Sequence, residues 1–482
     1  MKYLFNIAII SIFICLAASD GYAFELDRVR VNIYDYTPDN DDQSVINAGL
    51  VTSDNNIVLA GGESLKSNGF MADIFVVKLT FDGDTLWTRR LGAPLTHEGA
   101  TDIIETSDGN LVVLCFVQFD GNFGRLRLYK LSPDGALLWE KTYLAETEYS
   151  ISQGLTETPD HGLIITGESD YDMFLFKTNA DGDSLWMATF GGAYNDQGGA
   201  VAATSDGGAI LLGTVATAAV RHDSLVVMRV DASGTVNWRH AYPFNGGSGF
   251  WGRLCLFENA DGDFVGAASS ANDNLGYVYK WNAAGTELWS TVLHPAETAM
   301  IHCASAAKND AVYFAGAGTD GAMFGKVDDA GDSLLLSFPD DNDFIAVNFI
   351  YQDVYGDVYA AGRCRDGDFY LMKLRENYTT SVDDGAAAVP ASSLLSQNYP
   401  NPFNPSTVIN YRVPGESYVT LKIYNSLGRT VATLVDGFRA EGDYTARWDG
   451  LDSRGERAAS GAYLYRLTVG EYEHSRKMLL LR

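Results

Sequence analysis

Tryptophans recur along this chain at an almost constant interval. The series consists of Trp87, Trp139, Trp186, Trp238 and Trp289. Consecutive members are separated by 52, 47, 52 and 51 residues, and each follows a lysine or arginine by nine residues. Leu335 takes the next position of the series, and Lys373 adds a seventh basic residue. A period of about 50 residues is typical of repeat architectures, so most of the chain is predicted to be one unit made seven times.

The second copy shows what one unit contains. Four short β-rich segments follow one another, separated by turns rich in Asp, Asn and Gly. They are Ala100–Thr106, Leu111–Val117, Arg125–Leu131 and Leu137–Tyr143. Short strands at this spacing predict a four-stranded antiparallel meander. Such a meander repeated around an axis is a β-propeller blade, so the predicted class is all-β.

The ends of the repeat array decide the blade count. The first three strands occur seven times, the last copy ending at Lys373-Leu374, but the fourth strand occurs only six times after its turn. The alternating segment Arg28–Tyr36 precedes the first copy and is available as the missing strand. Because an open sheet edge invites aggregation, we predict a seven-bladed propeller closed by this N-terminal strand. Six or eight blades remain as alternatives.

The first residues resemble an export signal. Lys2 gives a positive start, Tyr3–Ala18 is apolar, and Gly21-Tyr22-Ala23 fits a small-x-small cleavage site, with Ala17-Ala18-Ser19 as the alternative. A membrane anchor is the competing interpretation. No later segment is apolar for long enough to span a bilayer, so we expect no transmembrane segment in the mature chain.

Charge restricts the class of partner. The net charge of −28 arises within residues 1–393, whereas residues 394–482 carry 11 basic and 9 acidic side chains. A field of this sign repels nucleic acid, so no nucleic-acid partner is expected. The acidity also keeps an exported protein soluble, which is an explanation that needs no partner.

Four cysteines follow the signal, namely Cys115, Cys255, Cys303 and Cys364. An even number in an exported chain permits two disulfides in three connectivities. Cys255 and Cys303 stand in corresponding first strands and form the best-placed pair. Buried free thiols are the alternative.

Repeated residues receive structural interpretations. A tryptophan at one fixed position of an outer strand is expected to pack between adjacent sheets, and the basic residues are expected to pair with nearby acids. The Asn-x-Asp-Gly-Asp turns at Asn179 and Asn259 begin like calcium loops, but Asp and Asn also suit tight turns, and no EF-hand glutamate follows. No metal site is predicted. The turn-x-x-x-Trp pattern resembles the docking motif of quinoprotein-like propellers, which implies a fold and no cofactor.

The connections divide into two sets. First-to-second and third-to-fourth turns are short and uniform, and we expect them on one face. The other connections vary, and they include Gly61–Ala72, Thr214–His222, Pro243–Trp251 and Leu293–Met300. Because function is usually carried by variable loops on a rigid scaffold, the ligand is expected on this second face. The candidate ligand-binding residues there are His97, Glu98, Tyr149, Asn195, Asp196, Phe250 and Trp251.

Two classes of function are compatible with these residues. Phe250-Trp251, set among glycines, favours a binding or scaffold protein that recognises a glycan, peptide or surface partner. The alternative is structural, because the same two rings would also suit packing at the mouth of the central channel of the propeller. His97-Glu98 would suit acid–base work, which keeps an extracellular hydrolase or lyase as the alternative. No catalytic residue is assigned, because no nucleophile motif or metal-binding motif accompanies this pair.

The character of the chain changes after Leu374. Residues 377–393 are small and polar, as in a linker. Six alternating segments follow in under 90 residues, a pattern typical of an immunoglobulin-like sandwich. They are Thr407–Val413, Val419–Asn425, Arg429–Val435, Asp443–Trp448, Ala462–Val469 and His474–Leu481.

This C-terminal segment resembles the type A C-terminal sorting domain of the type IX secretion system, which is related to the Ig-like domain of flagellar hook-capping proteins. The residues that carry the resemblance are Asn398, Pro400, Asn401, Pro402, Phe403, Asn404, Pro405, Trp448, Gly461, Tyr463 and Lys477. The resemblance implies that outer-membrane secretion machinery is a partner and that the protein is secreted or held at the cell surface. A simple adhesion module is the alternative.

The expected organisation is therefore a signal peptide (1–23), a seven-bladed propeller (24–376), a linker (377–393) and an Ig-like sorting domain (394–482).

Overall fold

The fold is known from a computed structural model. It describes residues 22–34, 42–65, 70–92, 97–119, 122–143, 150–218, 221–247, 253–259, 261–270, 272, 275–293, 299–307, 310–318, 321–337, 344–353, 356–364, 368–380, 395, 398, 401, 403–413, 417–425, 430–440, 442–452, 457–469 and 472–480. For some of them, His97 and residues 22–30 included, only the backbone is described. Within these residues, no helix combines the length and the apolar character of a membrane span.

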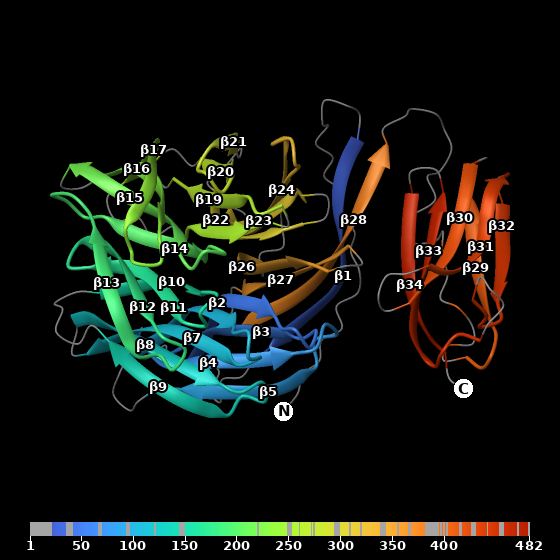
Figure 1. The fold of residues 1–482 in the computed structure, drawn as a ribbon, viewed down its shortest axis with the longest axis horizontal. Helices are drawn as coiled ribbons and strands as arrows, with labels where there is room; N and C mark the ends of the chain where they lie inside the picture. Colours follow the sequence, from blue (N-terminus) through green and yellow to red (C-terminus); the bar gives the residue numbers. More distant parts are fainter. Residues whose placement is uncertain are drawn as a thin grey trace. The chain divides into compact units, whose positions relative to one another are not determined.

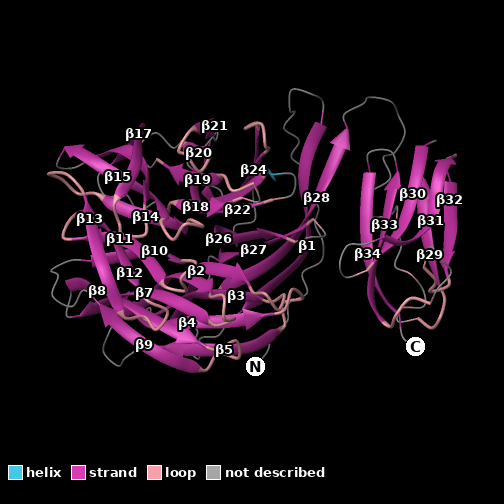
Figure 2. Ribbon diagram, viewed as in Figure 1, coloured by secondary structure: helices cyan, strands magenta, loops and turns pink. Residues whose placement is uncertain are grey.

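The chain forms two compact units, one containing Asp27–Arg375 and the other containing Glu376–Arg482. Strands predominate among the described residues of both units, as Figures 1 and 2 show. The all-β class predicted from the repeat is confirmed.

In its described residues the first unit contains seven four-stranded sheets, numbered here along the chain. Sheets 1 to 3 are β2(Asp42–Val51), β3(Ile57–Leu65), β4(Phe70–Leu79), β5(Thr85–Leu91); β6(His97–Glu105), β7(Leu111–Phe119), β8(Asn122–Leu131), β9(Leu137–Tyr143); and β10(Ser150–Glu157), β11(Leu163–Ser169), β12(Asp172–Thr178), β13(Ser184–Phe190). Sheets 4 and 5 are β14(Gln197–Ala203), β15(Ala209–Ala218), β16(Arg221–Val230), β17(Val236–Gly247); and β18(Cys255–Glu258), β19(Phe264–Ser269), β20(Gly276–Trp281), β21(Glu287–Leu293). Sheets 6 and 7 are β22(Ala299–Ala306), β23(Val312–Gly318), β24(Gly321–Val327), β25(Ser333–Ser337); and β26(Phe344–Gln352), β27(Asp357–Cys364), β28(Phe369–Thr380), β1(Tyr22–Tyr34).

Sheets 1 to 6 are antiparallel meanders, and their hydrophobic pattern changes from strand to strand. All seven residues of β11 are buried, whereas the outer strand β13 alternates between exposed and half-buried positions. A strand covered on both faces reads as a continuous apolar run, and a strand covered on one face alternates. The four strands predicted for the second copy are confirmed, with boundaries that differ by up to three residues.

The hydrophobic core lies between neighbouring sheets. One cluster joins Val58 and Val76 of sheet 1 to Val113 of sheet 2, and comparable clusters join sheets 2 and 3, 3 and 4, 4 and 5, and 5 and 6. Another joins Ile46 of sheet 1 to Phe349 of sheet 7. First strands of consecutive sheets lie side by side, including β22 with β26 and β26 with β2.

The N-terminal strand β1 pairs with β28, so it is the outer strand of sheet 7. Tyr34 stacks on Phe369 with ring centroids 4.9 Å apart. Its hydroxyl donates to the carbonyl oxygen of Gly83 (2.6 Å), and Nδ2 of Asn32 donates to the carbonyl oxygen of Asp82 (3.1 Å). Strand β1 therefore contacts the turn before β5, which belongs to sheet 1.

Three of the segments predicted to be loops lie partly in strands, so their loops are shorter than predicted. Much of Gly61–Ala72 and Thr214–His222 lies in paired strands, because the hairpins β3–β4 and β15–β16 continue as far as Leu65↔Phe70 and Ala218↔Arg221. Pro243 lies within β17, opposite Ser224.

The second unit has two sheets. One pairs β29(Thr407–Val413) with β32(Gly442–Trp448), and the other has the order β31(Thr430–Arg439), β30(Ser417–Tyr424), β33(Gly461–Val469), β34(Tyr472–Leu480). All six strands predicted for this segment are confirmed. Their inward-facing residues, among them Ile409, Leu421 and Leu467, form one buried core with Trp448.

Candidate functional site

Short turns of both uniform kinds lie together on one face of the first unit. Lys78 shows this directly, because its Nζ donates to Asp54 in the first turn of sheet 1 (2.7 Å) and to the carbonyl oxygen of Pro133 in the last turn of sheet 2 (3.3 Å). Arg229 and Lys280 also bind one acid or carbonyl in the next sheet and one acid in their own. The predicted pairing of basic residues with acids is confirmed for Lys78, Lys130, Lys177, Arg229, Lys280 and Lys373.

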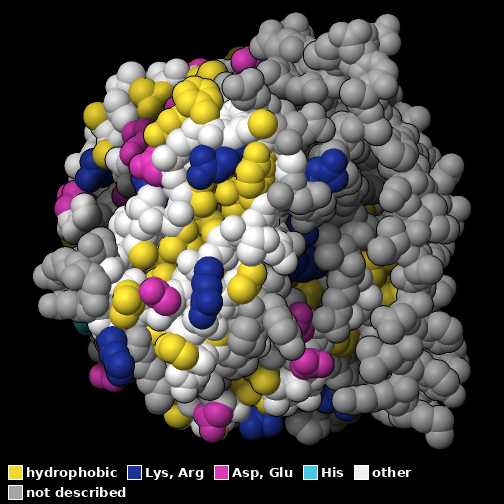
Figure 3. Space-filling model, turned by 90° about the vertical axis from the view of Figure 1, so that its right-hand side faces the viewer, with side chains coloured by type: hydrophobic (Ala, Val, Ile, Leu, Met, Phe, Trp, Pro, Cys, Tyr) yellow, Lys and Arg dark blue, Asp and Glu magenta, His cyan; other side chains and the backbone are white. Residues whose placement is uncertain are grey.

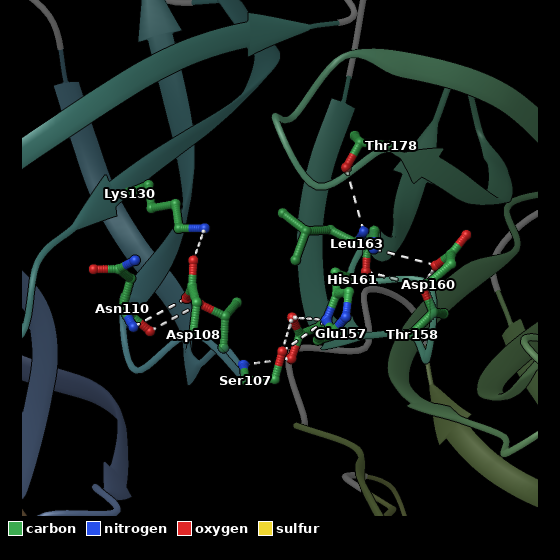
Figure 4. A network of polar contacts seen from close by, with 12 residues as sticks. Ser107, Asp108, Asn110, Lys130, Glu157, Thr158, Asp160, His161, Leu163 and Thr178 are labelled. Atoms are coloured by element: carbon green, nitrogen blue, oxygen red, sulfur yellow. Dashed lines mark hydrogen bonds and ion pairs between the residues drawn. The ribbon is translucent and has the colours of Figure 1, made fainter.

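Figure 4 shows this turn face between sheets 2 and 3. Ser107 donates its amide and its hydroxyl to the two oxygens of Glu157 (2.7 and 3.0 Å), and its Oγ lies 2.8 Å from Nδ1 of His161. Ser53 binds Glu105 in the same way between sheets 1 and 2. Because the same serine–glutamate contact occurs between both pairs of sheets, we interpret it as a structural contact that holds neighbouring sheets together.

Each tryptophan of the series packs on a glycine turn of the next sheet. Nε1 of Trp87 donates to the carbonyl oxygen of Pro133 (3.1 Å), and a methyl group added to Gly135 would lie 2.9 Å from the Trp87 ring. Trp139, Trp186, Trp238 and Trp289 lie similarly close to Gly182, Gly234, Gly285 and Gly331. Packing between sheets is confirmed, but the rings are half-buried, because the sheets diverge toward their outer strands.

The Asn-x-Asp-Gly-Asp turns serve the backbone. Oδ1 of Asn179 accepts from the amides of Asp181 (3.0 Å) and Asp183 (2.7 Å), and Asn259 repeats both bonds with Asp261 and Asp263. The side chain that would begin a calcium loop is therefore used to hold a left-handed glycine turn.

Glu98 does not lie on an exposed loop. It belongs to β6, and its carboxylate is fully buried. Oε1 binds NH1 of Arg127 (2.7 Å) and Oε2 accepts from the hydroxyl of Tyr129 (2.9 Å). Both carboxylate oxygens of Glu98 are therefore engaged by side chains of sheet 2. The side chain of His97 lies outside the described residues, as do Tyr149, Phe250 and Trp251.

Asn195 and Asp196 lie on the opposite face from the short turns, in the connection between β13 and β14. Asp196 is fully buried and binds the loop to its surroundings: its oxygens accept from the amides of Gly192 (2.6 Å) and Ala216 (2.9 Å). Its own amide donates to the carbonyl oxygen of Tyr171 (2.8 Å) in the β11–β12 turn. Burial raises the pKa of Asp196, with Asp172 adding to the effect. Two connections predicted to vary are thus joined by hydrogen bonds into one surface, here called the tyrosine platform (Asp170–Asp172 and Gly191–Gln197).

Two tyrosines project from the tyrosine platform. Tyr171 is 62% exposed and Tyr194 is 41% exposed. Asp170 and Tyr171 both have positive φ (50° and 72°), the conformation of a tight two-residue hairpin that residues with side chains rarely adopt. Exposed aromatic rings beside carboxylates and an amide suit the stacking and hydrogen bonding of a polar ligand.

Glu168 lies beneath this platform. It is 1% exposed, and its Oε2 accepts from Nε2 of Gln197 (2.6 Å). Burial raises the pKa of Glu168 to about 7, with the charge of Asp196 acting in the same direction. Sequence reasoning missed Glu168, since Gly-Glu-Ser at the end of an apolar strand reads as an exposed terminus.

A second group of polar side chains, also missed, lies where the first strands meet. It consists of Asn47, Asp102, Arg253, His302 and Asn348, and is called the first-strand cluster below. NH1 of Arg253 donates to the carbonyl oxygen of Asn47, and Nδ1 of His302 lies 2.9 Å from Oδ1 of Asn348. Asn47, His302 and Asn348 each occupy the register shift of their first strand, so aligning the repeats at this position would have found them.

The first-strand cluster has unusual protonation equilibria. Burial raises the pKa of Asp102 to about 6, although the amides of Leu155 and Ile103 and the charge of Arg253 oppose the shift. Burial, with Arg253 adding, lowers the pKa of His302 to about 4. The charge of Arg253 therefore acts both on a carboxyl that titrates near neutrality and on a histidine that is neutral there.

Cys115, Cys255, Cys303 and Cys364 are free thiols in this structure. The sulfur of Cys303 donates weakly to the carbonyl oxygens of Ala315 and Val347 (3.7 Å each). Burial raises the pKa of Cys255 to about 12.

Several residues of the sorting-type motif are part of the sandwich. Asn398 is 2% exposed; its amide donates to the hydroxyl of Tyr465 (2.8 Å), and its Nδ2 donates to Oγ1 of Thr407 (2.8 Å). Phe403 is buried, pairs with Leu480 at the edge of β34, and packs on Trp448. Oδ1 of Asn401 accepts from the amide of Leu479 (2.8 Å). The motif therefore closes the edge of the second sheet.

The other motif positions differ in exposure. Tyr463 and Trp448 are buried, whereas Asn404, Pro405 and Lys477 are exposed, and Pro400 and Pro402 lie outside the described residues. Phe438 (70% exposed) and Tyr418 (48% exposed) form an edge-to-face pair on the sandwich. Figure 3 shows one face of the molecule on which hydrophobic side chains lie between lysines and arginines.

Comparisons with known proteins bear mainly on the sandwich. Residues 406–471 match the family model of the FlgD Ig-like domain. No curated protein matches the chain.

Solved structures give low similarity. PorZ of Porphyromonas gingivalis, described as an essential bacterial surface component of the type IX secretion system, is 15% identical with a TM-score of 0.46; the match covers 93% of this chain and 60% of PorZ, so the chain spans about three fifths of that protein's length. A protein from Lactobacillus plantarum is 11% identical (TM-score 0.46; 81% and 99% covered), and one of unknown function from Dyadobacter fermentans is 10% identical (TM-score 0.45; 73% and 99% covered). At these TM-scores the similarities say nothing of ligand or activity.

Proposed function

We propose that this chain is an exported binding or scaffold protein whose first unit presents a ligand surface on the tyrosine platform. The observation that carries the proposal is the pair of exposed tyrosines on two connections that buried Asp196 fastens together. A rigid loop platform with exposed aromatic rings loses little entropy when it binds. Glycans and polar peptides are the ligand classes that this combination of rings, carboxylates and an amide suits best.

The scaffold is proposed to be a closed seven-bladed propeller. The contacts of β2 with β26 and the docking of Tyr34 on the sheet 1 turn support this proposal. In a closed ring every sheet is covered on both faces by neighbours, which holds the loop platform in one position.

The binding proposal is tested by a glycan and peptide array with the purified chain. Replacing Tyr171 and Tyr194 together by alanine is expected to abolish the strongest signal, at a cost of about 1–3 kcal/mol for the lost stacking. Leu185→Ala is the control, because Leu185 is 55% exposed on β13 and lies outside the platform. Equal binding by the double variant and wild type would contradict the proposal.

We further propose that the C-terminal unit is the sorting domain that directs passage across the outer membrane, with residues 377–393 as its linker and residues 1–23 as the cleaved signal. The Asn-Tyr-Pro-Asn-Pro-Phe-Asn-Pro segment and the FlgD Ig-like match support this proposal.

Removing residues 394–482 is expected to leave a folded first unit in the periplasm, because the two units have separate cores. Fractionation of cells that express the truncated and full-length chains measures this. Asn398→Ala should also reduce export by unfolding the sandwich, whereas Asn404→Ala, at an exposed position, should leave the fold intact. Full export of the truncated chain would leave an adhesion module as the better interpretation.

The first-strand cluster favours one alternative, an extracellular hydrolase or lyase. Asp102, with a pKa of about 6, is suited to general acid or base catalysis near Arg253. An activity screen against polysaccharides and polyuronates, run with wild type and Asp102→Asn, separates the two functions, because only an enzyme would lose turnover on that substitution.

A further inference from the structure

Three cationic side chains lie next to one another on the outer face of the four-stranded sheet in the second unit. Buried residues alternate with partly exposed ones along β30, and Lys422 belongs to the partly exposed set. Lys422 lies directly opposite Arg466 of β33, which is exposed. Exposed Lys477 of β34 lies opposite Leu464, two residues before Arg466, so Lys477 and Arg466 are diagonal neighbours. This surface is called the basic face below.

As a pair, the opposed lysine and arginine disfavour the sheet. The Cβ atoms of directly opposite residues are about 5 Å apart, and like charges in such pairs are destabilising. Of the side chains described on the basic face, Asp436 is the one acid, and it accepts from the hydroxyl of Tyr418 (2.8 Å). A charge pair that weakens its own sheet is better explained by an anionic partner than by the stability of the sandwich.

Exposed apolar side chains lie at both ends of the group of cations. At one end, Phe438 (70% exposed) lies opposite Tyr418 (48% exposed), and the two rings meet edge to face. At the other end, Leu464 lies opposite Tyr424, and Leu479 of the edge strand β34 is 37% exposed. Aromatic rings and leucines mixed with lysine and arginine are typical of protein surfaces that rest in the headgroup region of a bilayer.

We propose that the basic face binds the anionic headgroups of a lipid bilayer. Lys422, Arg466 and Lys477 would lie against lipid phosphates, and the Phe438 ring would enter the boundary between headgroups and acyl chains. A bilayer is favoured over an acidic protein because it accepts protruding rings and cations together without a matching pocket. The inference goes beyond the export proposed above, since membrane binding by this face does not require that the unit directs secretion.

The acidity of the whole chain does not prevent this contact. The net charge of −28 arises within residues 1–393, whereas residues 394–482 carry 11 basic and 9 acidic side chains. At physiological salt, exposed charges act over about 8 Å, so a surface is attracted according to the charges that it presents itself. The described side chains of the basic face contribute three positive charges and one negative charge.

Co-sedimentation of the purified full-length chain with vesicles tests the proposal. The vesicles consist of phosphatidylcholine alone, or of phosphatidylcholine with about one third phosphatidylglycerol. Wild type is expected to bind the anionic vesicles alone, and its binding should weaken as the salt concentration is raised. Lys422→Gln combined with Arg466→Gln should lower the partition coefficient roughly thirtyfold, because each cation contributes roughly fivefold near an anionic surface.

A matched control removes the same charge from elsewhere on the sandwich. Arg447→Gln combined with Arg457→Gln replaces two exposed arginines outside the four-stranded sheet, and it should change the partition coefficient by less than about threefold. Phe438→Ala should weaken binding about tenfold and leave the fold intact, because the ring is 70% exposed. This variant also tests the face if the double charge variant does not fold.

Absence of wild-type binding to the anionic vesicles would overturn the proposal, as would equal losses in the two double variants. Retention of wild type on immobilised polyglutamate without vesicle binding would instead assign the basic face to an acidic protein. Export in the fractionation experiment is read separately, so failure of the proposed sorting function leaves the vesicle result unchanged.

Discussion

At the scale of single residues, two turn glycines with positive φ differ in what surrounds them. Gly135 has φ +81° and lies under the Trp87 ring. Glycine is therefore needed there both for the left-handed turn and for the close packing of the indole. Gly109 has φ +79° with nothing within 4 Å of an added methyl group. Substitutions at these two positions therefore distinguish the cost of a left-handed backbone, which both share, from the cost of steric contact, which only Gly135 has.

Gly135→Ala is expected to destabilise the chain more than Gly109→Ala. Both variants force alanine into a left-handed conformation, which costs about 1 kcal/mol, and Gly135→Ala also displaces Trp87, which adds about 1–3 kcal/mol. Chemical denaturation of the two variants and wild type measures the difference. Equal losses would mean that the indole contact contributes nothing.

At the scale of elements, the period of the tryptophans predicted the strands well, because each copy places apolar runs and glycine turns at the same offsets. The sequence also indicated that Trp139 packs between sheets. It did not predict that Glu98 is buried, because its partners Arg127 and Tyr129 lie two strands away and alternate with leucines as an exposed strand face would. Asn195 and Asp196 were predicted from loop variability, but Glu168 beneath them depends on tertiary contact alone.

Trp139→Ala is expected to cost about 2–3 kcal/mol, less than a core tryptophan, because part of its side chain stays exposed to solvent. Leu138→Ala is the matched control: Leu138 is adjacent in β9 and 51% exposed, so its loss should fall within about 0.5 kcal/mol. Thermal melting of both variants and array binding of Trp139→Ala check this. Lost binding with unchanged stability would assign the tryptophan to a ligand.

At the scale of the whole molecule, neighbouring sheets stabilise one another through shared clusters, and sheet 7 alone draws its strands from both ends of the first unit. The contacts of Tyr34 with Gly83 and Phe369 connect that sheet to sheet 1. Loss of β1 would leave β28 as an unpaired edge.

Deleting Asp27–Tyr36 is therefore expected to lower the melting temperature and to promote aggregation. Tyr34→Phe, which keeps the stacking on Phe369 and removes the bond to Gly83, should lose only about 0.5–1.5 kcal/mol. Light scattering during thermal melting distinguishes the two. An unchanged melting temperature after the deletion would contradict a role for β1 in closing the ring.

The pairing of β1 with β28 has a consequence for how the protein is made. Tyr34 meets Phe369, a partner about 335 residues later in the sequence, so sheet 7 cannot form until nearly the whole first unit has left the ribosome. Contacts at such separation slow folding. The other six sheets of the first unit have no such requirement, because the four strands of each are consecutive in the sequence.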